Sequence, residues 1–398
     1  MSKQVQDAYI VAATRTPVGK KGGMFRHVRP DDMLAHVLRA VVAKAPGLDA
    51  REIGDVIVGC AMPEAEQGMN VARIGLLLAG LPDTVPGITI NRFCASGLQA
   101  VADAAARIRL GEAEVMIAAG TESMSVMPQI MGNKVSLNPA VFERAENLGI
   151  AFGMGLTAEK VASQWQVSRE VQDAFAAQSH QRAVAAIAAG HFRDEITPYT
   201  VRAHLPGEGG VVRLAERVCD TDEGPRADST AEGLAKLRPV FAARGSVTAG
   251  NSSQMSDGAG AVLLMSEGAV KRHGLTPIAR FAGYSVAGVP PQIMGIGPVE
   301  AIPRALKAAG IGLQQVDWIE LNEAFAAQAL AVARQLELDP ARVNPLGGAI
   351  ALGHPLGATG AIRTATLMSA MQRGAARYGM VSMCIGTGMG AAGVFEKV

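Results

Sequence analysis

The fold of this chain is best predicted from residues 88–108, which read ITINRFCASGLQAVADAAARI. The first six residues are typical of a strand, and the apolar residues from Leu98 to Ile108 recur at helical spacing. Gly111 then predicts the end of the helix, and residues 114–120 predict a second strand. Cys94 therefore stands at a helix start, where the positive end of the helix favours the nucleophilic thiolate.

A second unit of the same kind occurs near the end of the chain. Residues 348–360 read GAIALGHPLGATG, residues 361–371 predict a helix, and residues 378–386 predict a strand. The two units indicate an old duplication. If the two halves pack together, the helix starts that carry Cys94 and His354 can meet although they are far apart in the sequence.

The order of the elements predicts an α/β fold. In the first third, strands at 8–13 and 55–60 flank a helix at 32–42, and such alternation favours a largely parallel sheet covered by helices. We expect an N-terminal half made of residues 1–120 and 248–276 and a C-terminal half made of residues 277–398. Residues 121–247 break the pattern and are interpreted as an inserted loop domain that forms a binding surface.

Composition excludes several classes of protein. The net charge is +1, from 37 basic and 36 acidic residues spread along the chain, which argues against a nucleic-acid binder. Four cysteines in 398 residues do not form a disulfide framework, and Cys60 and Cys219 are expected to be inert. We find no export signal at the start and no apolar run long enough to span a membrane, so we expect a cytoplasmic protein.

Four segments carry the chemistry. They are residues 91–100 (NRFCASGLQA), 322–326 (NEAFA), 347–360 (GGAIALGHPLGATG) and 384–392 (CIGTGMGAA). In this order and at these separations they resemble the thiolase family, over essentially the whole chain. The resemblance implies a duplicated fold with two mixed or parallel sheets and helices in α-β-α-β-α layers, plus the inserted loop domain.

The resemblance also assigns roles to residues. Cys94 is the expected acyl carrier, and His354 is the expected base for its proton. With a water held by Asn322, His354 would donate a hydrogen bond to the thioester oxygen as enolate charge develops. Cys384 is the expected second acid and base, and the backbone N–H groups of Cys94 and Gly386 would form the other oxyanion hole. Asn322 could also simply cap the following helix.

Contacts with coenzyme A are expected in the insertion and near the acyl group. By resemblance, Arg226 contacts the nucleotide, Ser253 approaches the pantetheine arm, and Met154 and Met294 form walls near the acyl group. Arg226 could equally be a solvated surface charge, and the two methionines could be ordinary core residues. Thiolases of the short-chain type commonly have a histidine before the methionine matched by Met154, and this chain has Gly153 there.

The sequence therefore predicts an acyltransferase that cleaves 3-oxoacyl-CoA with CoA in fatty acid β-oxidation. The alternative is an acetoacetyl-CoA thiolase that condenses two acetyl-CoA molecules. Two further alternatives are a 3-oxoacyl synthase acting on acyl carrier protein and a non-catalytic acyl-CoA-binding protein, and the set Cys94, His354 and Cys384 argues against both. The glycine run 386–393 could be read as a nicotinamide-binding fingerprint, but it lacks the acidic ribose ligand.

We expect no metal and no cofactor, since CoA is a substrate. We also expect a homodimer or homotetramer, with possible association with a hydratase/dehydrogenase subunit.

Overall fold

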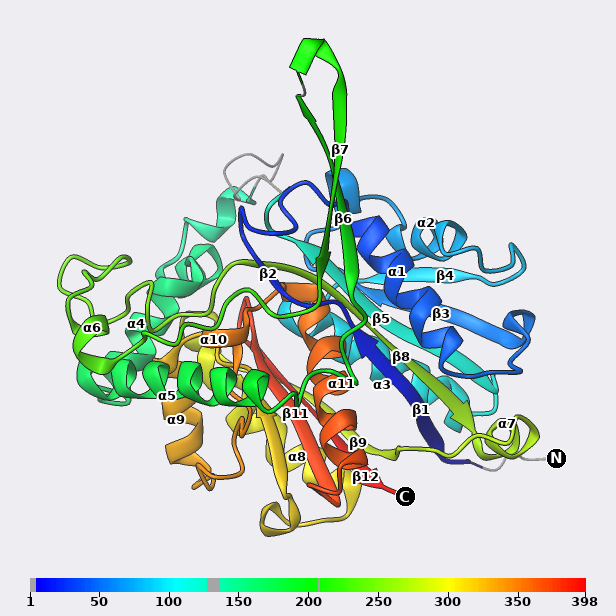
Figure 1. Cartoon of the computed structure of the whole chain (residues 1–398). Coiled ribbons are helices and arrows are strands. Elements are labelled where there is room, and N and C mark those ends of the chain that lie inside the picture. Colours follow the sequence, from blue (N-terminus) through cyan, green and yellow to red (C-terminus); the bar gives the residue numbers. More distant parts are fainter. Residues whose placement is uncertain (1–4, 127–136, 207) are drawn as a thin grey trace.

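The computed structural model describes residues 5–126, 137–206 and 208–398 (Figure 1). In the first half the elements are β1 Ala8–Arg15, β2 Gly19–Lys20, α1 Pro30–Ala43, β3 Ile53–Gly59, α2 Val71–Leu78, β4 Gly87–Ile90, α3 Ser96–Arg109, β5 Val115–Ser123, β8 Ser256–Ser266 and α7 Glu267–Arg272. In the second half they are β9 Ala279–Gly288, α8 Gly297–Ala309, β10 Trp318–Leu321, α9 Ala326–Gln335, α10 Ala349–Leu352, α11 Thr359–Gln372, β11 Tyr378–Ile385 and β12 Met389–Lys397. Among the described residues, no helix combines the length and apolar character needed to cross a membrane.

The two halves repeat one strand arrangement. In the first half the order is β3-β5-β8-β1, with β4 added at the outer edge, and in the second half it is β10-β11-β12-β9. In each half the first pair is parallel and the next two pairs are antiparallel. This correspondence supports the duplication that the sequence predicts.

The expectation of two separate sheets needs a correction. Strands β1 and β9 are the inner edges of the two halves, and they pair antiparallel at Tyr9 with Arg280 and at Ile10 with Ala279. The halves therefore form one continuous ten-stranded mixed sheet. An unpaired edge exposes backbone donors and acceptors, and this short pairing satisfies some of them.

Helices α3 and α11 lie in the middle of the molecule, in contact with strands of both halves. Helices α1 and α2 cover the outside of the first half, and α8 covers the outside of the second. The two central helices touch through backbone, because a Cβ on Gly97 would lie 2.7 Å from the Ala361 nitrogen and one on Gly360 would lie 2.0 Å from the Leu98 nitrogen. Glycine at these positions brings together the two helix starts.

The segment between β5 and β8 contains α4 Met154–Gln164, α5 Arg169–Ala188, β6 Tyr199–Pro206, β7 Val212–Cys219 and α6 Ala231–Ala235. Strands β6 and β7 form a two-stranded antiparallel hairpin that stands away from the rest of the molecule (Figure 1). The expectation of a loop domain at residues 121–247 did not include this hairpin. The alternation of Val201, Ala203 and Leu205 with polar residues is the signal that predicts the strand.

Candidate active site

Cys94 lies in a 3-10 turn, Phe93–Ala95, between β4 and α3. Phe93 has a φ of 45°, a left-handed conformation that costs free energy in a residue other than glycine. Two side chains hold this turn: the Asn91 Oδ1 accepts from the Phe93 N–H (2.8 Å), and the Ser96 hydroxyl donates to the Phe93 carbonyl (2.7 Å). These two hydrogen bonds therefore fix the turn that carries Cys94.

Burial and neighbouring groups act in opposite directions on the pKa of the Cys94 thiol. Burial raises the pKa of the Cys94 thiol to about 11, although the N–H groups of Gly386 and of Cys94 itself act in the opposite direction and favour the thiolate. The nearby Glu122 carboxylate raises this pKa further. The helix start favours the thiolate, as the sequence predicts, but desolvation is the larger effect. The thiol must give up its proton to a base before it can attack.

His354 is buried beside Thr359 and Asn322. Burial, followed by the positive charge of Arg363, lowers the pKa of His354 to about 3, so that the imidazole is neutral near pH 7. Its Nδ1 lies 2.7 Å from the Thr359 hydroxyl, and its Nε2 lies 3.4 Å from the Asn322 Nδ2. Because an amide NH2 only donates, Nε2 is assigned as the acceptor and Nδ1–H as the donor to Thr359. This tautomer leaves the lone pair of Nε2 on the side of Asn322.

The backbone before His354 requires glycine. Gly353 has a φ of 90°, and a Cβ there would lie 2.4 Å from the Ser256 Oγ. The N–H of His354 donates to the Gln254 carbonyl (3.2 Å) and to the Ser256 hydroxyl (3.1 Å), which ties this loop to the start of β8. The imidazole is therefore held from both its ring and its backbone.

Asn322 does not act as the helix cap that the sequence left open. Helix α9 begins at Ala326 with Phe325 at the N-cap position. The Asn322 side chain is instead buried beside His354, and its Oδ1 has no hydrogen-bond partner in the part of the chain that the structure describes. A buried acceptor without a partner is costly unless a water or a substrate satisfies it.

Cys384, near the end of β11, is fully buried. Burial, followed by the charge of Cys94, raises the pKa of the Cys384 thiol well above its usual range. Cys384 and Met294 belong to one apolar cluster with Met154 packed against it. A Cβ on Gly386 would lie 3.6 Å from the Met154 sulfur, so the structure brings both predicted methionines to the two cysteines.

Arg226 and Ser253 lie further out. Arg226 is exposed and lines a pocket of about 370 Å³ together with His180, Ser252 and Gln254. The Arg226 N–H donates to the His180 Nδ1 (3.2 Å), and burial, followed by the charge of Arg226, lowers the pKa of His180 to about 4. The backbone N–H of Ser253 donates to the carbonyl of Ala324 (2.9 Å), so Ser253 lies between this pocket and the segment that follows Asn322.

Thr359 and Glu122 lie near the site and were not predicted from the sequence. Thr359 lies inside the quoted glycine-rich motif, and its position five residues after His354 is the signal that could have identified it. Glu122 is a carboxylate at the end of the apolar strand β5, and it accepts from the N–H groups of Ala61 (2.8 Å) and Gly357 (2.9 Å). Glu122 therefore connects the first half to the loop that follows His354.

Comparison with protein families gives two matches that together span the chain. The model described as thiolase, N-terminal domain, matches residues 8–268, and that described as thiolase, C-terminal domain, matches residues 275–397. A 3-ketoacyl-CoA thiolase of Bacillus subtilis is 52% identical over 393 residues, which cover 98% of this chain and 100% of the relative.

Solved structures give the same result. The acetyl-CoA acetyltransferase of Bacillus anthracis matches with a TM-score of 0.90 and 41% identity, over 100% of both chains. Human mitochondrial 3-ketoacyl-CoA thiolase matches with a TM-score of 0.87 and 40% identity, over 99% of both chains. The predicted fold and the predicted family are thus confirmed.

Proposed function

Because this chain belongs to the thiolase family, we propose that it cleaves 3-oxoacyl-CoA with CoA through an acyl group carried on Cys94. The observation that carries the proposal is the arrangement of the two helix starts. A thiol with two N–H groups directed at its sulfur lies on one, and a neutral buried imidazole lies beside the other. Acyl transfer needs a nucleophile, a base and oxyanion donors, and this arrangement supplies all three.

In the first half-reaction the Cys94 sulfur attacks the 3-oxo carbon, and the thiol proton moves to His354. The bond between C2 and C3 then breaks, its electron pair stays on C2, and the Cys384 thiol protonates that carbon. Acetyl-CoA leaves, and Cys94 carries the shortened acyl group. The Cys94 and Gly386 N–H groups stabilise the oxyanion at the acyl carbon, while His354 and a water on Asn322 stabilise the enolate oxygen.

In the second half-reaction the thiol of a new CoA gives its proton to the Cys384 thiolate. The CoA sulfur attacks the acyl carbon, the Cys94 sulfur leaves, and the proton on His354 returns to it. All three groups recover their starting protonation. The raised pKa of the buried Cys384 thiol suits this role, because a basic thiolate can accept a proton from CoA.

The experiment is thiolysis with the wild type, Cys94→Ala and Cys384→Ala. We expect no activity with Cys94→Ala and no acyl-enzyme by mass spectrometry after addition of acyl-CoA. Cys384→Ala should stop the exchange of the acetyl-CoA methyl protons with deuterated solvent, measured by NMR. Full thiolysis by Cys94→Ala would disprove the mechanism.

The physiological substrate is proposed to be a 3-oxoacyl-CoA longer than four carbons, in fatty acid β-oxidation. The Gly153 before Met154 supports this, since it removes a ring from the acyl wall. The likeness to an acetyl-CoA acetyltransferase supports the second candidate, condensation of two acetyl-CoA molecules. Thiolysis rates for substrates of increasing chain length distinguish the two, because a sharp preference for four carbons would favour the second.

Acyl-CoA and CoA are the proposed small-molecule partners, with Arg226 at the nucleotide and Ser253 at the pantetheine arm. Arg226 supports this role by lining an open pocket on the same side as the Asn322 segment. Replacement of Arg226 with Ala should raise the KM for CoA and leave kcat nearly unchanged. The homo-oligomer, the cytoplasmic location, the absence of a cofactor and the association with another subunit stay predictions, as do the domain boundaries.

A further inference from the structure

A buried row of polar side chains runs away from His354 between β10 and α11. Side chains alternate along a strand, so Glu320 lies on the same side of the chain as Asn322. On α11, Arg363 follows Thr359 by four residues and therefore lies on the same helix face. Asn322 and Thr359 both contact His354, and one step further along the row the Glu320 Oε2 lies 3.7 Å from the Arg363 NH1.

Glu320 is incompletely satisfied in this position. Its Oε1 accepts from the Trp318 indole N–H (2.7 Å), while among the described residues its Oε2 has no hydrogen bond and only the distant ion pair with Arg363. Both side chains are almost completely buried, at 1% and 4% exposure. Burial of a carboxylate with so few hydrogen-bond donors disfavours its charged form and raises its pKa.

Two neighbouring carboxylates also favour the protonated form of Glu320. Burial, together with the carboxylates of Glu195 and Glu323, raises the pKa of Glu320 to about 7, against the effects of Arg363 and the Trp318 N–H. Glu323 is held by the Ser179 hydroxyl, the Asn344 amide and the Ile350 N–H.

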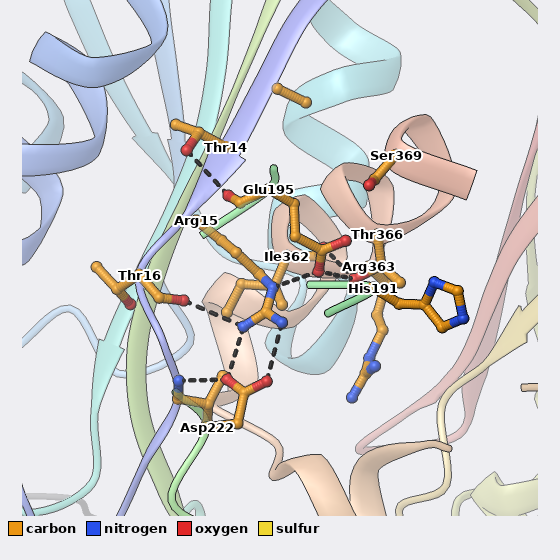
Figure 2. A network of polar contacts seen from close by, with 12 residues as sticks. Thr14, Arg15, Thr16, His191, Glu195, Asp222, Ile362, Arg363, Thr366 and Ser369 are labelled. Carbon is orange, nitrogen blue, oxygen red and sulfur yellow. Dashed lines mark hydrogen bonds and ion pairs between the residues drawn. The ribbon is translucent and has the colours of Figure 1, made fainter. Parts of the chain in front are cut away.

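Glu195 lies further along the same row of polar side chains, beside Thr366 of α11. Its Oε1 accepts from the Thr366 hydroxyl of α11 (2.8 Å) and from Arg15 (2.7 Å). Figure 2 shows the Arg15 guanidinium between the carboxylates of Glu195 and Asp222, beside the helix that carries Arg363. Arg15 is paired with Glu195 and Asp222, while Arg363 forms its ion pair with Glu320 and also interacts with the charge of Glu323.

Arg363 connects Glu320 to the base. Its charge lowers the pKa of His354, whereas the groups that act on Cys94 are two backbone N–H groups and Glu122. A change in the charge balance at Arg363 therefore alters the basicity of His354 more than the acidity of Cys94. We propose that ionised Glu320 is a positioning residue that neutralises Arg363 and so allows His354 to take the Cys94 proton. This inference rests on the proposed function.

The proposal predicts that acylation of Cys94 slows as the pH falls. When pH falls through about 7, Glu320 takes up a proton and no longer offsets the Arg363 charge, which of these two carboxylates then interacts with Glu323 alone. A less compensated cation disfavours the imidazolium that forms when His354 accepts the Cys94 proton, so acylation slows. His354 has its own pKa near 3 and cannot cause a loss of rate close to neutrality. We therefore expect an acid limb of kcat/KM near pH 7 that is caused by Glu320.

The test is the pH profile of thiolysis between about pH 5.5 and about pH 9 for four enzymes: wild type, Glu320→Gln, Arg363→Met and the double variant. We expect Glu320→Gln to be about tenfold slower than wild type at pH 8, a value that corresponds to one pKa unit on His354, and to have lost the limb near pH 7. Arg363→Met should also lack the limb but keep its rate at low pH. The double variant should recover most of the wild-type rate, since neither charge remains.

The matched control is Glu300→Gln, which removes an exposed carboxylate from an ion pair with Arg304 on α8 and should leave the profile unchanged. Circular dichroism and urea unfolding check that each variant folds, and Arg363→Met alone tests the inference if Glu320→Gln does not fold. A wild-type limb retained in Glu320→Gln, or no recovery in the double variant, would overturn it. Mass spectrometry of acyl-Cys94 in the wild type separates the two proposals, because absence of the acyl-enzyme would contradict the proposed function itself.

Discussion

The hydrogen bond between His354 and Thr359 allows a quantitative prediction. Replacement of Thr359 with Val keeps the shape of the side chain and removes the acceptor that lies 2.7 Å from the His354 Nδ1. Both residues are buried, with Thr359 at 1% and His354 at 5% exposure, so water cannot easily replace the hydroxyl. Leaving this buried donor unpaired should reduce the free energy of unfolding by about 1–3 kcal/mol.

The effect on rate is smaller than the effect on stability, because only a difference between ground state and transition state changes the rate. A hydrogen bond from the neutral imidazole contributes about 0.5–1.5 kcal/mol, and one from the imidazolium about 1.5–3 kcal/mol. The bond therefore strengthens by about 1–1.5 kcal/mol as His354 takes up the proton. We expect kcat/KM for thiolysis to fall by about tenfold at pH 8, with little change in the KM for CoA.

The matched control is Thr364→Val. Thr364 is also buried on α11, but its hydroxyl donates to the Gly360 carbonyl within the helix (2.7 Å). This variant should lose some stability and keep its thiolysis rate, while Thr359→Ser should restore most of the activity. If Thr359→Val has the wild-type kcat/KM, or if Thr364→Val loses as much activity, the hydrogen bond to His354 does not assist acylation.

Three further predictions follow from burial and packing. Alkylation of Cys94 by iodoacetamide, followed by peptide mapping, should accelerate about tenfold per pH unit between about pH 6 and about pH 9 because its pKa lies near 11; a plateau in that range would contradict this. Gly360→Ala should reduce the free energy of unfolding by about 1–3 kcal/mol or more, since its Cβ would meet backbone, whereas Gly288→Ala, which has open space, should change it little; equal effects in urea unfolding would refute the packing argument. Arg15→Met leaves two buried carboxylates without their partner and should cost about 3–5 kcal/mol, so an unchanged unfolding midpoint would show that they are satisfied otherwise.

Local pattern was sufficient for much of the fold. The apolar spacing predicts α3 and the helix at α11 to within a few residues. The hairpin of β6 and β7 was missed because its exposed strands carry polar residues, which resemble a loop when turns and pairing are not considered. The edge pairing of β1 with β9 was missed because it depends on how two halves approach each other, and no local pattern encodes that.

The same division applies to the candidate site. Cys94, His354, Cys384 and Asn322 could be selected from their motifs, since motif residues and spacing are properties of the chain. Their protonation states could not, because these depend on desolvation and on charges brought near by folding. The helix start beside Cys94 favours the thiolate, and the opposing and larger effect of burial appears only in the folded chain.

The sequence by itself determined the duplicated α/β class, the family and the four residues expected to carry the chemistry, because strand and helix periodicity and the motifs are all local. Tertiary structure alone decided that Gly97 and Gly360 bring the two helix starts into backbone contact, and that Thr359 holds the ring of His354. It also decided that Glu320 and Arg363 form an ion pair next to the residues that contact His354. The physical reason is that contact and burial, which set distances and pKa values here, arise between residues that are far apart along the chain.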